Sequence, residues 1–269
     1  MRKVSLTAEY YQQFDADYGL DVPAEGYGGW KLSEVEIDLD HTALVVMHAW
    51  KTGTLAVYPG WYRAVEYIPR AREILRKVFP ALLERVRANG VRLYHVVGSG
   101  NYYQGLTGYK RAARLAGPAP TLEQLGSDPS LDKLRRFRKQ HVFVGERNEA
   151  DVARGFEELD FAPEARPLAD EGIAENGDQL FALCRSDETY HLIYTGFAVN
   201  WCLLMSPGGM LDMSRRRAMC SVIRQACTAV ENKETARREL NKEIGLWRVA
   251  LAFGFVFDVE EFKRAVSTR

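Results

Sequence analysis

The sequence has no excess of charge of either sign and no long apolar run. Its 269 residues include 36 basic and 36 acidic side chains, so the formal net charge at pH 7 is zero. Without net positive charge there is no strong field to hold nucleic acid or an anionic membrane. No apolar run reaches the roughly eighteen residues of a membrane span, and the first residues, MRKVSLTAEYYQQFDADYG, lack the apolar segment of an export signal. We therefore expect a cytoplasmic protein that binds neither nucleic acid nor membrane.

Cysteine and histidine are few and scattered along the chain. No two cysteines have C-x-x-C spacing and no two histidines have H-x-x-x-H spacing, so the sequence gives no positive sign of a metal site. The spacing is also not that of a disulfide framework, which favours reduced thiols. We therefore expect no metal site. The residues concerned are Cys184, Cys202, Cys220, Cys227, His41, His48, His95, His141 and His191.

Apolar runs typical of strands alternate with patterns typical of helices. From residue 71 the apolar residues have a helical spacing of 3.6, and Pro80 predicts a short lead-in followed by a new helix. Residues 234–247 have a second such spacing, and Asp258 with Glu261 predicts a capped start to the last helix. Strands are expected at 42–48 (TALVVMH), 91–98 (VRLYHVVG), 190–196 (YHLIYTG), 218–225 (AMCSVIRQ) and 249–257 (VALAFGFVF).

This alternation predicts an α/β fold of three layers, with a mostly parallel central sheet and helices on both faces, as in Rossmann-like proteins. We expect a single domain over residues 1–269, because no linker separates two cores. Its core would cover about 35–267, with 1–34 as an N-terminal extension. Residues 99–147 are polar and weakly periodic, which is typical of an insertion, a lid or a subunit contact. The basic run at 131–141, LDKLRRFRKQH, favours a solvated helix face or subunit contact over nucleic-acid binding.

A glycine-rich segment, GSGNYYQG at 98–105, resembles a dinucleotide-binding turn only superficially. After G-x-G the next glycine comes five residues later instead of three, and no helix pattern begins there. A glycine-rich turn is the better interpretation.

Cys202 is the residue on which the functional interpretation depends. It lies in TGFAVNWCLLM (195–205), between a predicted strand and a helical pattern. A buried cysteine is often only a small apolar residue. At the start of a helix, however, free backbone N–H groups favour a thiolate and can stabilise an oxyanion. His48 also ends an apolar run, and ligands of such sheets bind beyond the carboxyl ends of strands, so the two residues are expected at the same edge.

Five segments together resemble the isochorismatase-like cysteine hydrolases, the superfamily of nicotinamidases and N-carbamoylsarcosine amidohydrolases. They have the order and approximate spacing of that family over about residues 35–267. The most specific is G-F-A-x-N-x-C. The segments are TALVVMHAW, IPRAREIL, ANGVRLYHVV, LIYTGFAVNWCLL and IRQACTAVE.

The resemblance implies a nucleophile and an oxyanion hole. The nucleophile would be Cys202, and the backbone N–H groups of Ala198 and Cys202 would hold the oxyanion, near an unusual cis peptide in the loop 197–199. The family has an aspartate at the end of its first strand, where this sequence has His48. A histidine can activate a thiol by taking its proton and returning it to the leaving group.

The lysine of the family has no counterpart here. No lysine lies between Lys139 and Cys202, and the stretch LDFAPEARPLADEG offers only Arg166 as a cation. Arginine supplies charge but does not exchange a proton near neutrality. The strand that resembles the family's R-D-A-T-x-x-x-E keeps two of its residues and replaces two, namely Arg224, Glu231, Gln225 and Cys227.

We therefore expect a hydrolase that cleaves a C–N bond, amide or carbamoyl, of a small molecule through a thioacyl intermediate on Cys202. His48 would act as base and then as acid, and Arg166 would orient an anionic group. Trp50 and Asn200 would line the substrate site. The resemblance implies no organic cofactor and a homo-oligomer.

A second hypothesis is a non-catalytic protein of the same fold that binds a small molecule. It would have lost activity with the family's aspartate and lysine. A lone histidine at the end of a strand is often structural, and Trp50 is as consistent with packing as with a pocket wall. The sequence leaves both hypotheses open.

Overall fold

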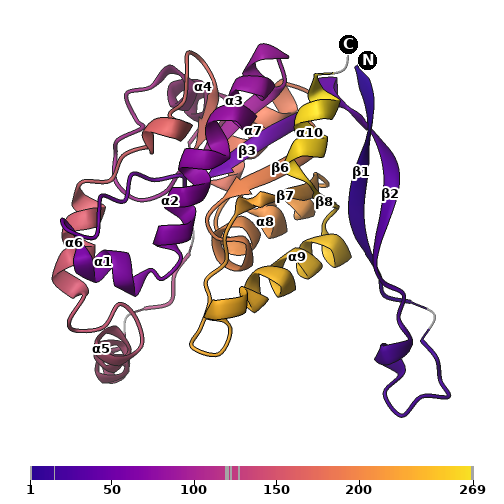
Figure 1. Ribbon diagram of the computed structural model, residues 1–269. Helices are drawn as coiled ribbons and strands as arrows, with labels where there is room; N and C mark the ends of the chain where they lie inside the picture. The colour runs from indigo at the N-terminus through magenta and orange to yellow at the C-terminus, as the bar shows by residue number, and fades with distance from the viewer. Residues whose placement is uncertain (1, 15, 119–120, 122, 127, 268–269) are drawn as a thin grey trace.

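The computed structural model of the protein has eight strands in one sheet between two layers of helices (Figure 1). It describes residues 2–14, 16–118, 121, 123–126 and 128–267. From edge to edge the strands follow the order β2, β1, β8, β7, β6, β3, β4, β5. Their bounds are β1 Lys3–Gln12, β2 Gly29–Asp38, β3 Thr42–Met47, β4 Arg92–Val96, β5 Gly172–Ala174, β6 His191–Gly196, β7 Met219–Cys227 and β8 Val256–Phe257.

The sheet is mostly parallel, as the sequence predicted. Strands β3 to β8 pair in parallel, whereas β1 pairs antiparallel with both β2 and β8. Strands β1 and β2 thus form a hairpin that extends the sheet at its β8 side, and β2 continues past residue 34 to Asp38. Figure 1 shows that the loop joining β1 to β2 projects away from the rest of the molecule.

Helices cover both faces of the sheet. In β3, Leu44 and Val46 face the core formed with α2, α3 and α10, while Ala43, Val45 and Met47 face the core formed with α4, α7, α8 and α9. This alternation follows from the strand period of two. The α-helices are α1 Pro59–Ala64, α2 Ile68–Lys77, α3 Phe79–Ala88, α4 Thr107–Ala116, α5 Asp132–His141, α6 Glu149–Glu157, α7 Gly177–Ser186, α8 Met210–Arg215, α9 Leu240–Ala252 and α10 Val259–Val266.

The cap predicted for the last helix is present. The Asp258 carboxylate accepts hydrogen bonds from the backbone N–H groups of Glu260 and Glu261, at 2.8 and 3.1 Å. These N–H groups have no partner within the helix, so the side chain at the cap fixes where α10 begins.

Two predicted elements differ in the structure. The strand expected at 249–257 is wrong over most of its length, because α9 continues through Ala252 and only Val256–Phe257 forms β8. Val249 is buried together with Leu246 on one face of α9, so this apolar run belongs to a buried helix end. The helix expected at 234–247 begins only at Leu240. Residues 99–147, expected to be an insertion, a lid or a subunit contact, contain α4 and α5, and α5 coincides with the basic run for which a helix face was one expectation.

Gly196, the last residue of β6, lies against the backbone of β3. Its φ angle is +121°, and a Cβ built there would lie 1.9 Å from the carbonyl oxygen of Met47. The next residue, Phe197, donates its N–H to the same carbonyl at 3.2 Å. Glycine is therefore required where β6 passes into the Cys202 loop.

We expect Gly196→Ala to lower the free energy of unfolding by at least about 2 kcal/mol, because the added methyl group overlaps backbone that cannot move aside. Urea denaturation followed by circular dichroism measures the change. Gly105→Ala is the matched control, since a Cβ there meets nothing within 4 Å. Equal stabilities of the two variants would contradict the close approach.

Candidate active site

The carboxyl ends of β3, β4, β5 and β6 meet at one edge of the sheet, since β3 pairs in parallel with β4 and β6, and β4 with β5. His48 directly follows β3, Glu175 directly follows β5, and the loop that holds Cys202 follows β6. The parallel pairing therefore brings to one edge three chemically active side chains that are far apart in the sequence.

Cys202 lies in a single π-helical turn, Val199–Leu203, after a cis peptide bond between Phe197 and Ala198. Its side chain is partly exposed, whereas the other three cysteines are buried. The sulfur receives hydrogen bonds from the Ser206 side chain and from the backbone N–H of Ala198. Both contacts favour the thiolate over the thiol.

Burial nevertheless raises the pKa of Cys202 above its ordinary value, because desolvation outweighs the two hydrogen bonds. No cation among the residues that the structure describes contributes to this balance. The low thiol pKa expected for a helix start is therefore wrong. The turn is too short and too buried for its N–H groups to compensate for lost water.

His48 is half-buried and its imidazole is neutral. Desolvation lowers its pKa to about 4, and its Nδ1 atom is buried and has no hydrogen-bond partner among the described residues. Its ring stacks on Trp50 with centroids 4.6 Å apart and an interplanar angle of 17°. The backbone φ of His48 is +51°, which is uncommon for a residue other than glycine, and its N–H donates to the Val96 carbonyl at 3.0 Å.

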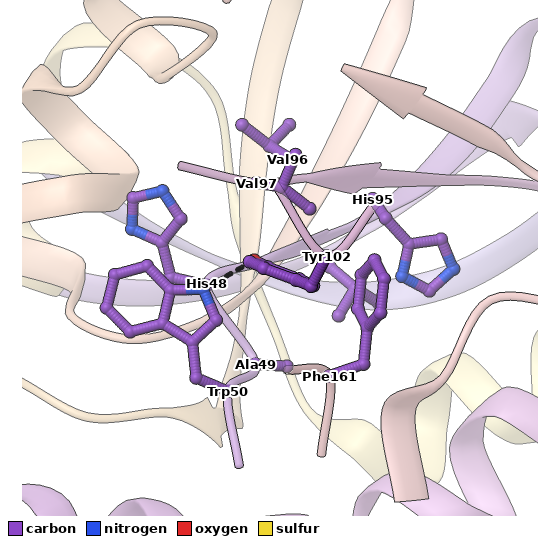
Figure 2. A pocket seen from close by; sticks show the side chains of 9 residues that line it. His48, Ala49, Trp50, His95, Val96, Val97, Tyr102 and Phe161 are labelled. Atoms are coloured by element: carbon purple, nitrogen blue, oxygen red, sulfur yellow. Dashed lines mark hydrogen bonds between the residues drawn. The ribbon is translucent and has the colours of Figure 1, made fainter. Parts of the chain in front are cut away.

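His48 lines a narrow cavity that has no room for a water molecule. Figure 2 shows His48 and Trp50 on one side and His95 on the other, with Tyr102 and Phe161 between them. The Trp50 Nε1–H donates to the Tyr102 hydroxyl at 2.9 Å. Trp50 is thus held by its own hydrogen bond and in turn fixes the plane of the His48 ring.

The structure does not join His48 to Cys202. Among the described residues no hydrogen bond links the imidazole to the sulfur, and Cys202 is not one of the residues that line the His48 cavity. The two groups therefore rest as a neutral imidazole and a neutral thiol rather than as an ion pair.

Arg166 and Asn200 are both engaged elsewhere. Arg166 forms an ion pair with Asp160, lies 5.9 Å from the centre of the Phe161 ring, and is 48% exposed. Asn200 exchanges two hydrogen bonds with the backbone of Val230, at 2.8 and 2.9 Å. In this arrangement Asn200 ties the Cys202 turn to the segment after β7, which is a structural contact.

The sequence interpretation missed Glu175, the polar residue at the end of β5. Its carboxylate accepts hydrogen bonds from the hydroxyls of Tyr103 and Tyr109, both at 2.9 Å, and from the Gln179 amide at 3.1 Å. The sequence signal that could have identified Glu175 is its position directly after the buried run GIA. An acidic residue therefore follows β5, at the edge where the family resemblance implies a cation.

The sequence interpretation also missed an ionic group around His95, which lines the same cavity as His48. His95 is fully buried in β4, and its Nε2–H donates to Glu171 at 2.9 Å; Arg87 binds the same carboxylate through two nitrogens, at 2.6 and 3.0 Å. Burial opposes ionisation of Glu171, but hydrogen bonds from His95, Arg87 and the Leu168 N–H outweigh it and lower its pKa to about 2. Burial also lowers the pKa of His95, so its ring is neutral.

The part of the chain that the structure describes contains no group of three or more histidine, cysteine, aspartate or glutamate residues that could hold a metal ion. No helix in the described ranges is long and apolar enough to cross a membrane.

No protein-family profile and no curated protein matches this chain. Solved structures do. A cysteine hydrolase from Pseudomonas syringae pv. phaseolicola is 13% identical over 86% of this chain and 94% of its own, with a TM-score of 0.51. An isochorismatase family protein from Burkholderia thailandensis is 13% identical over 85% and 97%, with a TM-score of 0.45. N-carbamoylsarcosine amidase from Thermoplasma acidophilum is 16% identical over 82% and 97%, with a TM-score of 0.44.

The fold is therefore that of an α/β protein with a mostly parallel sheet and helices on both faces. Within that class it is similar to the fold of the Pseudomonas syringae cysteine hydrolase, in agreement with the fold that the sequence motifs predicted. At this identity the similarity defines the fold and not the reaction.

We expect the stability of the protein to fall as the pH drops from about 4.5 to about 2. The folded pKa of Glu171 lies below its unfolded value, so its contribution is present above pH 4.5 and is lost on protonation in the folded state. Glu171→Gln should remove about 3 kcal/mol at pH 7 and flatten this part of the profile. Urea unfolding at several pH values measures both effects. The exposed Glu84→Gln is the control, and the same loss in both variants would refute the assignment.

We expect iodoacetamide to label Cys202 alone in the native protein, because the other thiols are buried. Its raised pKa should make labelling at pH 7 at least about tenfold slower than at pH 9. Mass spectrometry across this range gives the profile, with Cys202→Ser as the blank. A rate that is already maximal below pH 7 would show a thiolate that the described environment does not provide.

Proposed function

We propose that this protein is a cytoplasmic cysteine hydrolase that cleaves an amide or carbamoyl C–N bond of a small molecule and works as a homo-oligomer. The observation that carries the proposal is the setting of Cys202. It is the one partly exposed cysteine among the four, and its sulfur receives hydrogen bonds from Ala198 N–H and Ser206 at the carboxyl edge of the sheet.

In the proposed reaction the Cys202 sulfur attacks the substrate carbonyl and forms a thioester. Its proton passes to His48 and then to the leaving nitrogen, while the N–H groups of Ala198 and Cys202 hold the oxyanion. Water, activated by the neutral imidazole, releases the acid product. The released acid and amine contain all atoms of the substrate and one water.

The first proton transfer, from the Cys202 thiol to the His48 imidazole, is uphill. Burial raises the pKa of the Cys202 thiol and lowers that of His48 to about 4, so the two values are further apart than in water. The substrate must therefore bring the pair together, and the proton must move in concert with attack on the carbonyl. We therefore expect the Cys202 thiol to react slowly in the free protein and rapidly in the substrate complex.

A second candidate function is small-molecule binding without catalysis. The raised thiol pKa favours it, and so does the absence of a described hydrogen bond between His48 and Cys202. Arg166, the one cation that the sequence offered, is paired with Asp160. Such a protein would use the same edge of the sheet and would release no acid.

Hydrolysis of a panel of small primary amides and carbamoyl compounds separates the two functions. We expect ammonia release that Cys202→Ala abolishes and that His48→Gln lowers by about two orders of magnitude, the usual contribution of a general base. Mass spectrometry should show an acylated Cys202 in His48→Gln, where deacylation is slow. Cys184→Ala is the control, since Cys184 is buried away from this edge.

Binding of a panel compound, measured by calorimetry, with no turnover and no acyl adduct would instead establish the binding protein. Turnover that persists in Cys202→Ala would exclude Cys202 as the nucleophile.

A further inference from the structure

Two surface segments carry apolar side chains that the described part of the chain does not cover. One is the hairpin arm, defined here as residues 13–28 between β1 and β2. The other is the basic helix, defined here as residues 131–143 with α5 at its centre. Figure 1 shows the two segments on opposite flanks of the molecule.

The basic helix has an exposed apolar stripe. No residue of α5 is buried, and Leu134 and Phe137 are 62% and 58% exposed. With Leu131 they recur at three-residue steps, so they lie along one side of the helix. Val142 and Phe143 continue the apolar surface beyond its end. An amphipathic helix with an uncovered stripe is typical of a docking element.

The hairpin arm is also apolar at its surface. Its exposed side chains include Tyr18, which is 93% exposed, together with Phe14, Leu20 and Val22. The 3-10 turn Pro23–Gly26 within the arm likewise contains no buried residue. These side chains contribute nothing to either core of the sheet.

The two segments have opposite charge. Residues 131–143 contain five basic residues and one acidic residue, whereas residues 13–28 contain four acidic residues and no lysine or arginine. Three bases of the helix, Lys133, Arg136 and Arg138, form no ion pair with any residue that the structure describes. In the arm, the Asp17 carboxylate accepts the Gly19 N–H and has no cationic partner within the described ranges.

We propose that the hairpin arm of one copy of this chain docks on the basic helix of a second copy. The two segments are complementary in two respects. Each has an exposed apolar surface, and the acidic residues of the arm complement the basic residues of the helix. Since they lie on opposite flanks of one chain, the contact forms between copies. It joins two different surfaces, so reciprocal docking closes a dimer of two arms and two helices. This contact does not depend on the proposed hydrolysis.

An anionic membrane or a nucleic acid would suit the basic helix alone. It would repel the arm and leave the apolar side chains of the arm exposed. A second copy covers both segments at once, which is why the observations favour it.

Sedimentation velocity of the full chain tests the proposal. At about 50 mM salt we expect a species larger than the 30.5 kDa monomer. Reversing the arm charges should raise the dissociation constant at least about tenfold, and so should raising the salt to about 0.5 M. The arm variant is Asp17→Lys, Asp21→Lys, Glu25→Lys. A monomeric wild-type protein, or an arm variant that associates like the wild type, would overturn the proposal.

A variant with reversed charges on the basic helix provides the decisive test. Alone, this variant should associate as weakly as the arm variant. Mixed with the arm variant it should form a heterodimer, because a basic arm then meets an acidic helix and an acidic arm meets a basic helix. The helix variant is Lys133→Glu, Arg136→Glu, Arg138→Glu.

The matched control adds the same positive charge at other exposed sites. It should associate like the wild type and should not pair with the helix variant. If the helix variant forms heterodimers equally well with this control, the pairing depends only on net charge, and the proposal is overturned. So would a wild-type chain that stays monomeric and binds phosphatidylserine vesicles through its helix. The control is Glu84→Lys, Glu234→Lys, Glu260→Lys.

Discussion

The pairing of β3 between β4 and β6 is the constraint on which the candidate site depends. It fixes where three strands end, and the Met47 carbonyl at the end of β3 receives the Phe197 N–H while excluding any side chain at Gly196. The Thr195 hydroxyl adds a hydrogen bond to the Val45 carbonyl at 2.9 Å. The Cys202 loop therefore starts from a backbone position that neighbouring strands determine.

His48 and Cys202, at the carboxyl ends of the strands, differ from Glu171 in one respect. All three lose water on folding, but only Glu171 has a charged partner in the described part of the chain. Glu171 loses water but gains His95 and Arg87, and so stays ionised. His48 and Cys202 lose water and gain no such partner, so both rest uncharged. The ionic group around Glu171 thus has a structural role, whereas His48 and Cys202 of the candidate site stay neutral.

The sequence predicted the layers, most of the parallel strands and the shared edge of His48 and the Cys202 loop, because apolar periodicity and capping are local properties. Asp258 is an example. It did not predict α9 through Ala252, since a short apolar run suits a buried helix end as well as a strand. Nor could it predict the group around Glu171 or the thiol pKa of Cys202. Both depend on desolvation and on partners brought together only by the fold, as His95 and Glu171 are.

The position of β2 at one edge of the sheet has a consequence for aggregation. Its outer side offers backbone groups that another chain could pair with, yet most of this strand is exposed and carries Lys31, Glu34 and Glu36. Extending the sheet with a further strand would crowd these charges and strip their water. Lateral fibre growth is therefore disfavoured, and the protein is protected from indefinite stacking without a covering helix on that side.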